Sequence, residues 1–270
     1  MTWLKMTRKA LYLMERGGSR YLEKVDLDVH NLEKNEYKLE MPLHWFQDTN
    51  APRRMAIEVD ENHAEPEPAT GQSVLDTYNR VITTQQWGAR PRSVQPQTNP
   101  QYIVIHHTAH KTNPNPPNDD SRRTQAGGEQ LARTFQRVHI DINGWHDSGH
   151  NFLNTTGGFL LEGRHGSLAA VIRGNSVRSA HARSTPGKLP GGNESPGIEN
   201  EGNFSTFQML PQQWNSLVDL CAAICKSCNI DPNNIRGHRE FSATECPGQW
   251  LFSQLPRLRQ DVRDRLARDR

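Results

Sequence analysis

The 270-residue sequence has no long hydrophobic run. No apolar stretch reaches the roughly 18 residues needed to cross a bilayer, so we expect no transmembrane segment. Residues 1–24 include basic side chains but lack the continuous apolar stretch of a secretory signal. On this ground we expect a cytoplasmic protein, or one that leaves the cell by another route.

The chain also has little excess charge of either sign. Lys and Arg number 32 against 30 Asp and Glu, which gives a net charge of +2. A balance this close to neutral does not require a nucleic-acid partner, and it would not repel an anionic polymer. We therefore expect no nucleic-acid binding. The oligomeric state is not readable from these features.

Cysteine occurs only four times, and three of the four positions follow helical spacing. Cys221, Cys225 and Cys228 fall along one side of an expected helix. Residues stacked along one helix rarely meet disulfide geometry, so we interpret them as small buried thiols rather than a metal or redox site. Unpaired thiols are typical of a reducing compartment. Cys246 stands apart from this group.

The chain divides into three parts by composition. Residues 1–60 contain short alternating apolar runs separated by turn signals, which predict a small β-rich N-terminal unit of unknown role. A binding accessory and a stabilising extension both stay open for it. Residues 61–80 begin with a stretch rich in Glu, Pro and Ala and are expected to form a linker. Residues 81–270 form the main domain.

The main domain alternates strand and helix patterns, which predicts an α/β fold with one sheet covered by helices. Apolar runs predict strands, near-helical spacing predicts an amphipathic helix, and a proline in the first turn suits a helix start. The expected strands are 102–107, 151–154, 159–162 and 197–201, with the second and third forming a hairpin, and the expected helices are 127–139, 211–228 and a basic one from 255 onward.

Histidine and cysteine supply candidate metal ligands in two segments. His106 and His107 end one expected strand, and His238 precedes Cys246 by eight positions. A catalytic zinc takes three protein ligands and leaves a fourth position for water, and imidazole with thiolate suits that metal. By itself this spacing is a weak signal, because the chain contains 12 histidines.

A series of ordered motifs makes the metal-site hypothesis specific. The chain resembles the peptidoglycan recognition protein and N-acetylmuramoyl-L-alanine amidase family over about residues 82–252. The resemblance implies a central mixed β-sheet flanked by helices, with Zn²⁺ in a groove that holds peptidoglycan or a muropeptide. The motifs, in chain order, are TTQQWGARP, YIVIHHTA, VHIDINGWHDSGHNFL, FLLEGR, SAHA, GIENEGNF and GHREFSATECPG.

The resemblance also implies a ligand set. His106, His238 and Cys246 match the family's zinc ligands. His107 is expected to point to the other side of its strand, since successive strand residues face opposite ways. Family members that only bind peptidoglycan typically lack the cysteine ligand. Its presence favours an enzyme that hydrolyses the amide between N-acetylmuramic acid and L-alanine.

Three further positions match the family's reaction centre. Glu199 stands where cytoplasmic recycling amidases carry their base. Glu201 falls on the same expected strand face and is a weaker alternative, for which a structural role is the better interpretation. His150 replaces the tyrosine of many relatives, and its usual pKa near 6.5 suits proton transfer or a hydrogen bond to the oxyanion. Thr244 occupies a position beside the reaction centre and is expected to contact the oxyanion or the substrate.

Three more residues match positions near the family's substrate cleft. These are His181, Trp145 and Arg164, and for each a structural role is as good an interpretation as substrate contact. His139 ends the expected helix before a glycine-containing turn. We interpret it as a cation at a helix C-terminus and leave it outside the site.

Several alternatives stay open at this point. The protein could be a non-catalytic recognition protein that captures muropeptides, or a zinc enzyme that cuts another amide, such as one in the stem peptide. As an amidase it could act in muropeptide recycling or as a phage-type endolysin released through a membrane pore. The preferred stem peptide is not readable from the sequence.

Overall fold

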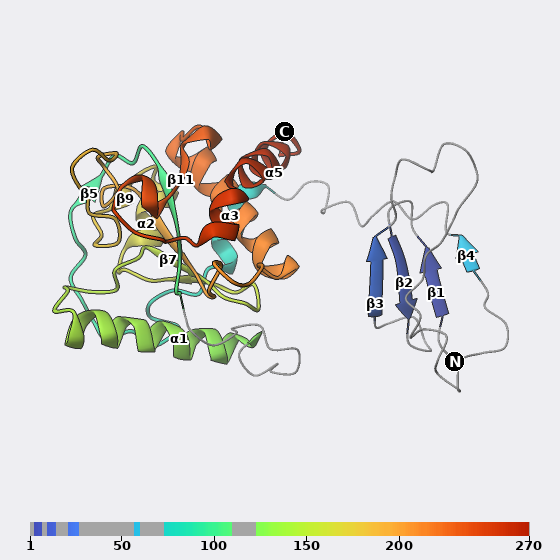
Figure 1. Ribbon diagram of the computed structural model, residues 1–270. Helices are drawn as coiled ribbons and strands as arrows, with labels where there is room; N and C mark the ends of the chain where they lie inside the picture. Colours follow the sequence, from blue (N-terminus) through green and yellow to red (C-terminus); the bar gives the residue numbers. More distant parts are fainter. Residues whose placement is uncertain are drawn as a thin grey trace. The chain divides into compact units, whose positions relative to one another are not determined.

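The computed structural model describes residues 73–109 and 123–269 and the backbone of four strands nearer the N-terminus. The chain divides into two compact units, Met1–Thr70 and Gly71–Arg270, and each is described by itself (Figure 1). Within the described part, no helix has the length and apolar character that crossing a membrane requires.

In the first unit, the described strands form one sheet in the order β3-β2-β1-β4. Strands β1 and β2, and β2 and β3, pair antiparallel, whereas β4 pairs parallel to β1. The rest of residues 1–60 lies outside the described residues, and the β-rich N-terminal unit stays a prediction. The bounds are Trp3–Met6 for β1, Ala10–Met14 for β2, Tyr21–Asp26 for β3 and Ile57–Val59 for β4.

The second unit is built on a mixed five-stranded sheet in the order β11-β6-β10-β7-β8. The first four strands pair parallel, and β8 pairs antiparallel to β7 as the expected hairpin. This confirms the α/β fold with a mixed central sheet. The strands span Ile103–His107 for β6, Phe152–Asn154 for β7, Leu160–Glu162 for β8, Gly197–Asn200 for β10 and Ile235–Gly237 for β11, with β5 (Gln97–Thr98) and β9 (Ser176–Val177) paired separately.

Helices cover both faces of this sheet. The expected helix 211–228 is confirmed as α3, which begins at Pro211 and ends before Asn229, a residue with positive φ. The expected helix 127–139 is α1, which starts two residues earlier and continues directly into a π-helix, η5. The bounds are η3 Val74–Arg80, α1 Gln125–Arg137, η5 Val138–Ile142, α2 Ser167–Ile172, α3 Pro211–Cys228, η6 Pro232–Asn234, η7 His238–Glu240, α4 Gln249–Ser253 and α5 Leu255–Ala267.

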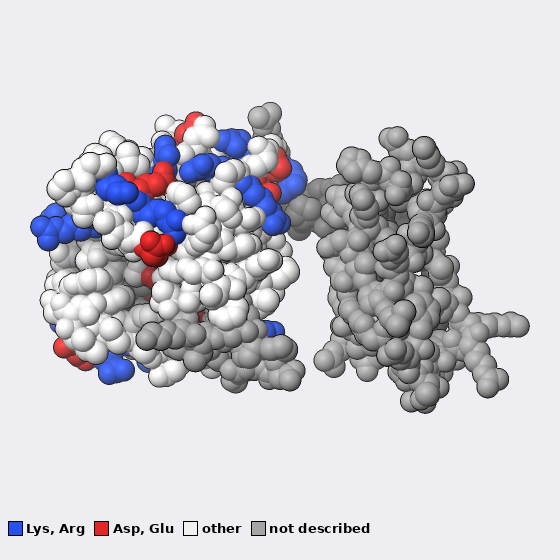
Figure 2. All heavy atoms as spheres, in the orientation of Figure 1, with Lys and Arg blue, Asp and Glu red and all other residues white. Residues whose placement is uncertain are grey.

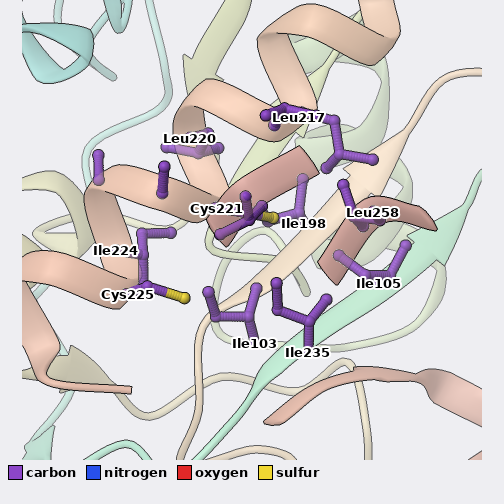
Figure 3. Close-up of a cluster of buried hydrophobic side chains, with 14 of the residues drawn as sticks. Ile103, Ile105, Ile198, Leu217, Leu220, Cys221, Ile224, Cys225, Ile235 and Leu258 are labelled. Atoms are coloured by element: carbon purple, nitrogen blue, oxygen red, sulfur yellow. The ribbon is translucent and has the colours of Figure 1, made fainter. Parts of the chain in front are cut away.

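The larger core lies between the sheet and α3 with α5. Figure 3 shows Ile103 and Ile105 of β6 and Ile198 of β10 in one cluster with side chains of α3. Cys221 and Cys225 are buried in this cluster, which confirms the interpretation of the helix cysteines as packed thiols. Residues 74–80, which fall within the expected linker, form η3 and pack against α3.

A smaller core lies on the opposite face, between the sheet and α1. It contains Trp87, Leu153 and Leu161, and the indole of Trp87 donates a hydrogen bond to the carbonyl of Glu162. Figure 2 shows Lys and Arg side chains interspersed with Asp and Glu on the visible face of the second unit, with uncharged residues between them. This face therefore presents both signs of charge.

Candidate metal centre

The candidate metal ligands gather where parallel strands end. His106 lies at the carboxyl end of β6, and His238 follows directly after β11, which pairs parallel to β6. Carboxyl ends of parallel strands meet at one edge of a sheet, a common place for ligand sites. Cys246 comes from the loop before α4 and approaches the same edge.

One donor atom from each of His106, His238 and Cys246 lies within 4.8 Å of the other two. The Sγ atom of Cys246 is 3.6 Å from Nδ1 of His106, and the two imidazole centroids are 4.4 Å apart. The backbone N–H of His107 donates a hydrogen bond to Sγ at 3.4 Å. The three side chains thus form a compact candidate metal group.

His107 lies on the other face of β6, as strand alternation predicts. Its Nδ1 accepts a hydrogen bond from the backbone N–H of Phe204 at 3.2 Å. His106 faces the opposite side and contacts the rings of His150, His181 and His238.

Burial keeps the imidazoles of the group neutral. Burial, and then the neighbouring imidazoles, hold the pKa of His106 and of His181 well below the usual histidine value. Burial lowers the pKa of His238 to about 4. Burial also raises the pKa of the Cys246 thiol. Neutral imidazole is the form that binds a metal, whereas the thiol must lose its proton to do so.

Glu199 lies beside His106 in the sheet, because the two residues are register partners on the parallel strands β10 and β6. The Glu199 carboxylate forms an ion pair with Nε2 of His150. Burial favours the neutral carboxyl, but the charge and hydrogen bond of His150 hold the pKa of Glu199 below its usual value. Glu199 is therefore ionised at neutral pH.

Glu201 does not share this position. Strand β10 ends at Asn200, so the alternation that would align Glu201 with Glu199 stops before it. The carboxylate of Glu201 instead accepts hydrogen bonds from the backbone N–H and the hydroxyl of Thr156, at 2.9 and 3.1 Å. It stabilises the turn that joins β7 to β8.

The other expected site residues contact protein groups in this structure. The hydroxyl of Thr244 accepts a hydrogen bond from the backbone N–H of Cys246 at 3.2 Å. Arg164 is buried, and its guanidinium donates to the carbonyls of Ser148 and Arg178. Trp145 is half-buried. Substrate or oxyanion contact by these residues stays a prediction.

His139 is a member of this cluster that sequence reasoning left out. It is 8% exposed, stacks on Trp145 with ring centroids 4.8 Å apart, and lies 5.7 Å from the ring of His150. The π-helix turns it inward, where its Nδ1 accepts from the backbone N–H of Gly149. A π-helical segment often marks a functional site, but no sequence pattern predicted the π-helix here.

The burial of His139 predicts a pH-dependent stability. Burial, with the nearby His150, lowers its pKa to about 4, whereas the opposing Glu199 raises it. Between about pH 6.5 and pH 4 the unfolded chain takes up a proton that the folded protein excludes. As the pH decreases through this window, the free energy of unfolding therefore decreases. His139 contributes up to about 3 kcal/mol of that loss.

We expect His139→Gln to reduce that loss of stability. Urea unfolding at pH 7.5 and pH 4.5 measures the loss in each variant. The control is His146→Gln, which changes an exposed histidine and should lose as much stability as wild type. An equal loss in His139→Gln and wild type would contradict the prediction.

Comparisons with known proteins agree with this fold. A family model described as N-acetylmuramoyl-L-alanine amidase matches residues 96–249, and the chain belongs to this family. Peptidoglycan-recognition protein SC2 of Drosophila melanogaster is 28% identical over 65% of this chain and 84% of its own length. The N-acetylmuramoyl-L-alanine amidase of Homo sapiens is 30% identical over 67% of this chain and 29% of its own length.

Solved structures of family members are similar to this chain in fold. Wild-type Drosophila PGRP-LB superposes with a TM-score of 0.52 at 28% identity, covering 65% of this chain and 92% of that one. A mutant of PGRP-LB was solved in complex with tracheal cytotoxin, with the same TM-score of 0.52, 28% identity and coverage of 66% and 93%. The relatives thus include both amidases and recognition proteins.

Proposed function

We propose that the protein is a zinc-dependent N-acetylmuramoyl-L-alanine amidase. Its substrate is peptidoglycan or a muropeptide, and it hydrolyses the amide between N-acetylmuramic acid and L-alanine. The observation that carries the proposal is the group of His106, His238 and Cys246, with the buried carboxylate of Glu199 on the neighbouring strand. Family membership supports the same reaction.

The donor set fits zinc. Two imidazoles and one thiolate are ligands that zinc accepts, and three protein ligands are typical of its catalytic sites. Zinc bonds of about 2.0–2.3 Å separate neighbouring ligand atoms by about 3.5 Å, close to the 3.6 Å between Sγ of Cys246 and Nδ1 of His106. The donor atom of His238 lies within 4.8 Å of the other two.

Zinc at this position would acidify a bound water and polarise the scissile carbonyl. The chain's own residues would then carry out the proton transfers. Glu199, ionised and buried, accepts a proton from the attacking water, and its partner Nε2 of His150 holds or passes a proton within the same pair. His150 thereby occupies the place of the family's tyrosine as a donor to the oxyanion or the leaving nitrogen.

The remaining roles are proposed by position. Thr244 adjoins Cys246 and would contact the oxyanion or the substrate. Trp145, with its half-buried ring next to His139, would contact the glycan or peptide. His181 and Arg164 are both buried, which favours a structural role for each over contact with the substrate. No role is assigned to residues 1–60, and the place where the protein acts stays a prediction.

Digestion of purified sacculi tests the reaction. We expect mass spectrometry to show released peptides with a free L-alanine amine and glycan chains that keep the lactyl carboxylate. Binding to sacculi without release would instead indicate a recognition protein. Cleavage within the stem peptide would indicate a different amide substrate. A chelator-treated sample, reloaded with zinc, provides the control for metal dependence.

Turnover on two substrates separates the biological roles. A recycling amidase should prefer soluble anhydro-muropeptides, whereas an endolysin should prefer intact wall. The same enzyme preparation is assayed on both, with the rate expressed per amide bond. A preference for one substrate by tenfold or more would assign the role.

A further inference from the structure

Two chains of hydrogen bonds lead away from the candidate metal ligands. We propose that these relays, each ending on a main-chain carbonyl, hold His106 and His238 in the tautomer that is protonated on Nε2. The lone pair of Nδ1 is then free to bind the metal, and His181 and Ser242 act as positioning residues. The inference rests on the zinc site of the proposed function and assigns residues that set its geometry.

The first relay starts at His106. Its Nε2 lies 3.0 Å from Nδ1 of His181, and Nε2 of His181 lies 3.0 Å from the carbonyl oxygen of Ser195. A carbonyl only accepts, so Nε2 of His181 carries the proton and its Nδ1 is an acceptor. Nε2 of His106 is therefore the donor. Its Nδ1 keeps a free lone pair, and this is the atom that faces Cys246.

The second relay starts at His238. Its Nε2 lies 3.1 Å from Oγ of Ser242, and that hydroxyl donates to the carbonyl of Arg183 at 2.6 Å. Because the single hydroxyl proton of Ser242 is used in the second bond, its oxygen accepts from Nε2–H of His238. Nδ1 of His238 is again left with a free lone pair. Two unrelated segments thus produce the same tautomer in both ligands.

The packing leaves His181 little freedom to turn. A Cβ atom placed on Gly197 would lie 2.4 Å from Cδ2 and 2.5 Å from Nε2 of His181, so the absence of a side chain there lets the ring lie against β10. The neighbouring Ala182 donates its backbone N–H to Oδ1 of Asn193 at 2.7 Å. This bond ties the segment of His181 to the loop that carries Ser195.

The relays have a measurable consequence for metal affinity. Groups that orient a metal-binding histidine through its second nitrogen typically change metal affinity or activity by 10–100-fold when they are removed. His181 is also buried, and the ring of His106 lies between it and the thiol of Cys246. His181 therefore acts through His106. Ser242 acts in the same way through His238.

Zinc affinity of the full-length protein tests both positions. We expect Ser242→Ala and His181→Ala to weaken zinc binding 10–100-fold in competition with a chelator, and Ser242→Thr, which keeps the hydroxyl, to restore most of it. Ser184→Ala is the matched control, because the Ser184 hydroxyl donates to the carbonyl of Leu189 outside either relay. A zinc affinity of Ser242→Ala within twofold of Ser184→Ala would overturn the assignment.

Imidazole NMR of the metal-free wild-type protein provides a second readout. Long-range ¹H–¹⁵N correlations report which ring nitrogen carries the proton, and we expect Nε2–H for both His106 and His238 at neutral pH. Nδ1–H at either residue would overturn the proposal, as would a mixture of tautomers. An inactive wild type that binds zinc with these tautomers would refute the amidase function alone. An active enzyme with unchanged zinc affinity in Ser242→Ala and His181→Ala would refute the relays alone.

Discussion

Cys246→Ala is expected to abolish zinc retention and hydrolysis together. The Cys246 thiolate is one of the three proposed zinc ligands, and the remaining pair, His106 and His238, would hold zinc far more weakly. His238→Ala should have the same effect for the same reason. Zinc per chain after dialysis, measured by atomic absorption, should fall to background. The rate of alanine-amine release should fall below detection in the same samples.

A matched cysteine variant separates loss of metal from loss of fold. Cys228→Ala removes a buried thiol on α3 that lies outside the candidate metal group, so it should keep zinc and activity. Circular dichroism of each variant checks that the fold persists without metal. Cys246→Ala that retained one zinc per chain would show that the ligand set is wrong. Retained hydrolysis without zinc would refute the proposed metal dependence.

Glu199→Gln is expected to keep zinc and to lower kcat by about 10²–10⁴-fold, the usual contribution of a positioned general base. Glutamine has the shape of glutamate and can still hydrogen-bond to His150, but it cannot accept the proton from water. The substitution therefore isolates proton transfer from packing. Stopped assays on a soluble muropeptide, with zinc content measured in parallel, give kcat and metal occupancy for the same protein.

Glu201→Gln is the matched control for this variant. Its carboxylate accepts two hydrogen bonds from Thr156 in the β7–β8 turn, so its loss should lower the melting temperature and leave kcat within a fewfold of wild type. A wild-type rate in Glu199→Gln would eliminate Glu199 as the base. A large loss of kcat in Glu201→Gln alone would move the role to Glu201.

Strand and helix patterns predicted the scaffold of the site well. The buried run at 102–107 became β6, and period-two alternation placed His106 and His107 on opposite faces. The helix 211–228 was readable because a first-turn proline and a long apolar pattern agree with each other, and its thiols are buried as expected. These features depend on neighbours in the chain, which a sequence displays directly.

Contacts between distant segments were not readable in the same way. The alternation rule aligned Glu201 with Glu199, but β10 ends one residue earlier and Glu201 bonds to Thr156 instead. His139 was interpreted as a helix-end cation, yet a π-helical turn buries it beside Trp145. Both outcomes depend on the residue at which a strand or helix ends.

The sequence by itself determined the family of this protein and the chemical types of its site: imidazole, thiolate and carboxylate in a fixed order along an α/β chain. The tertiary structure alone decided which nitrogen of each imidazole faces the candidate metal position. The reason is physical. A hydrogen bond has a direction, and the partners that set these directions, Ser195 for His181 and Arg183 for Ser242, come from segments that only folding brings together.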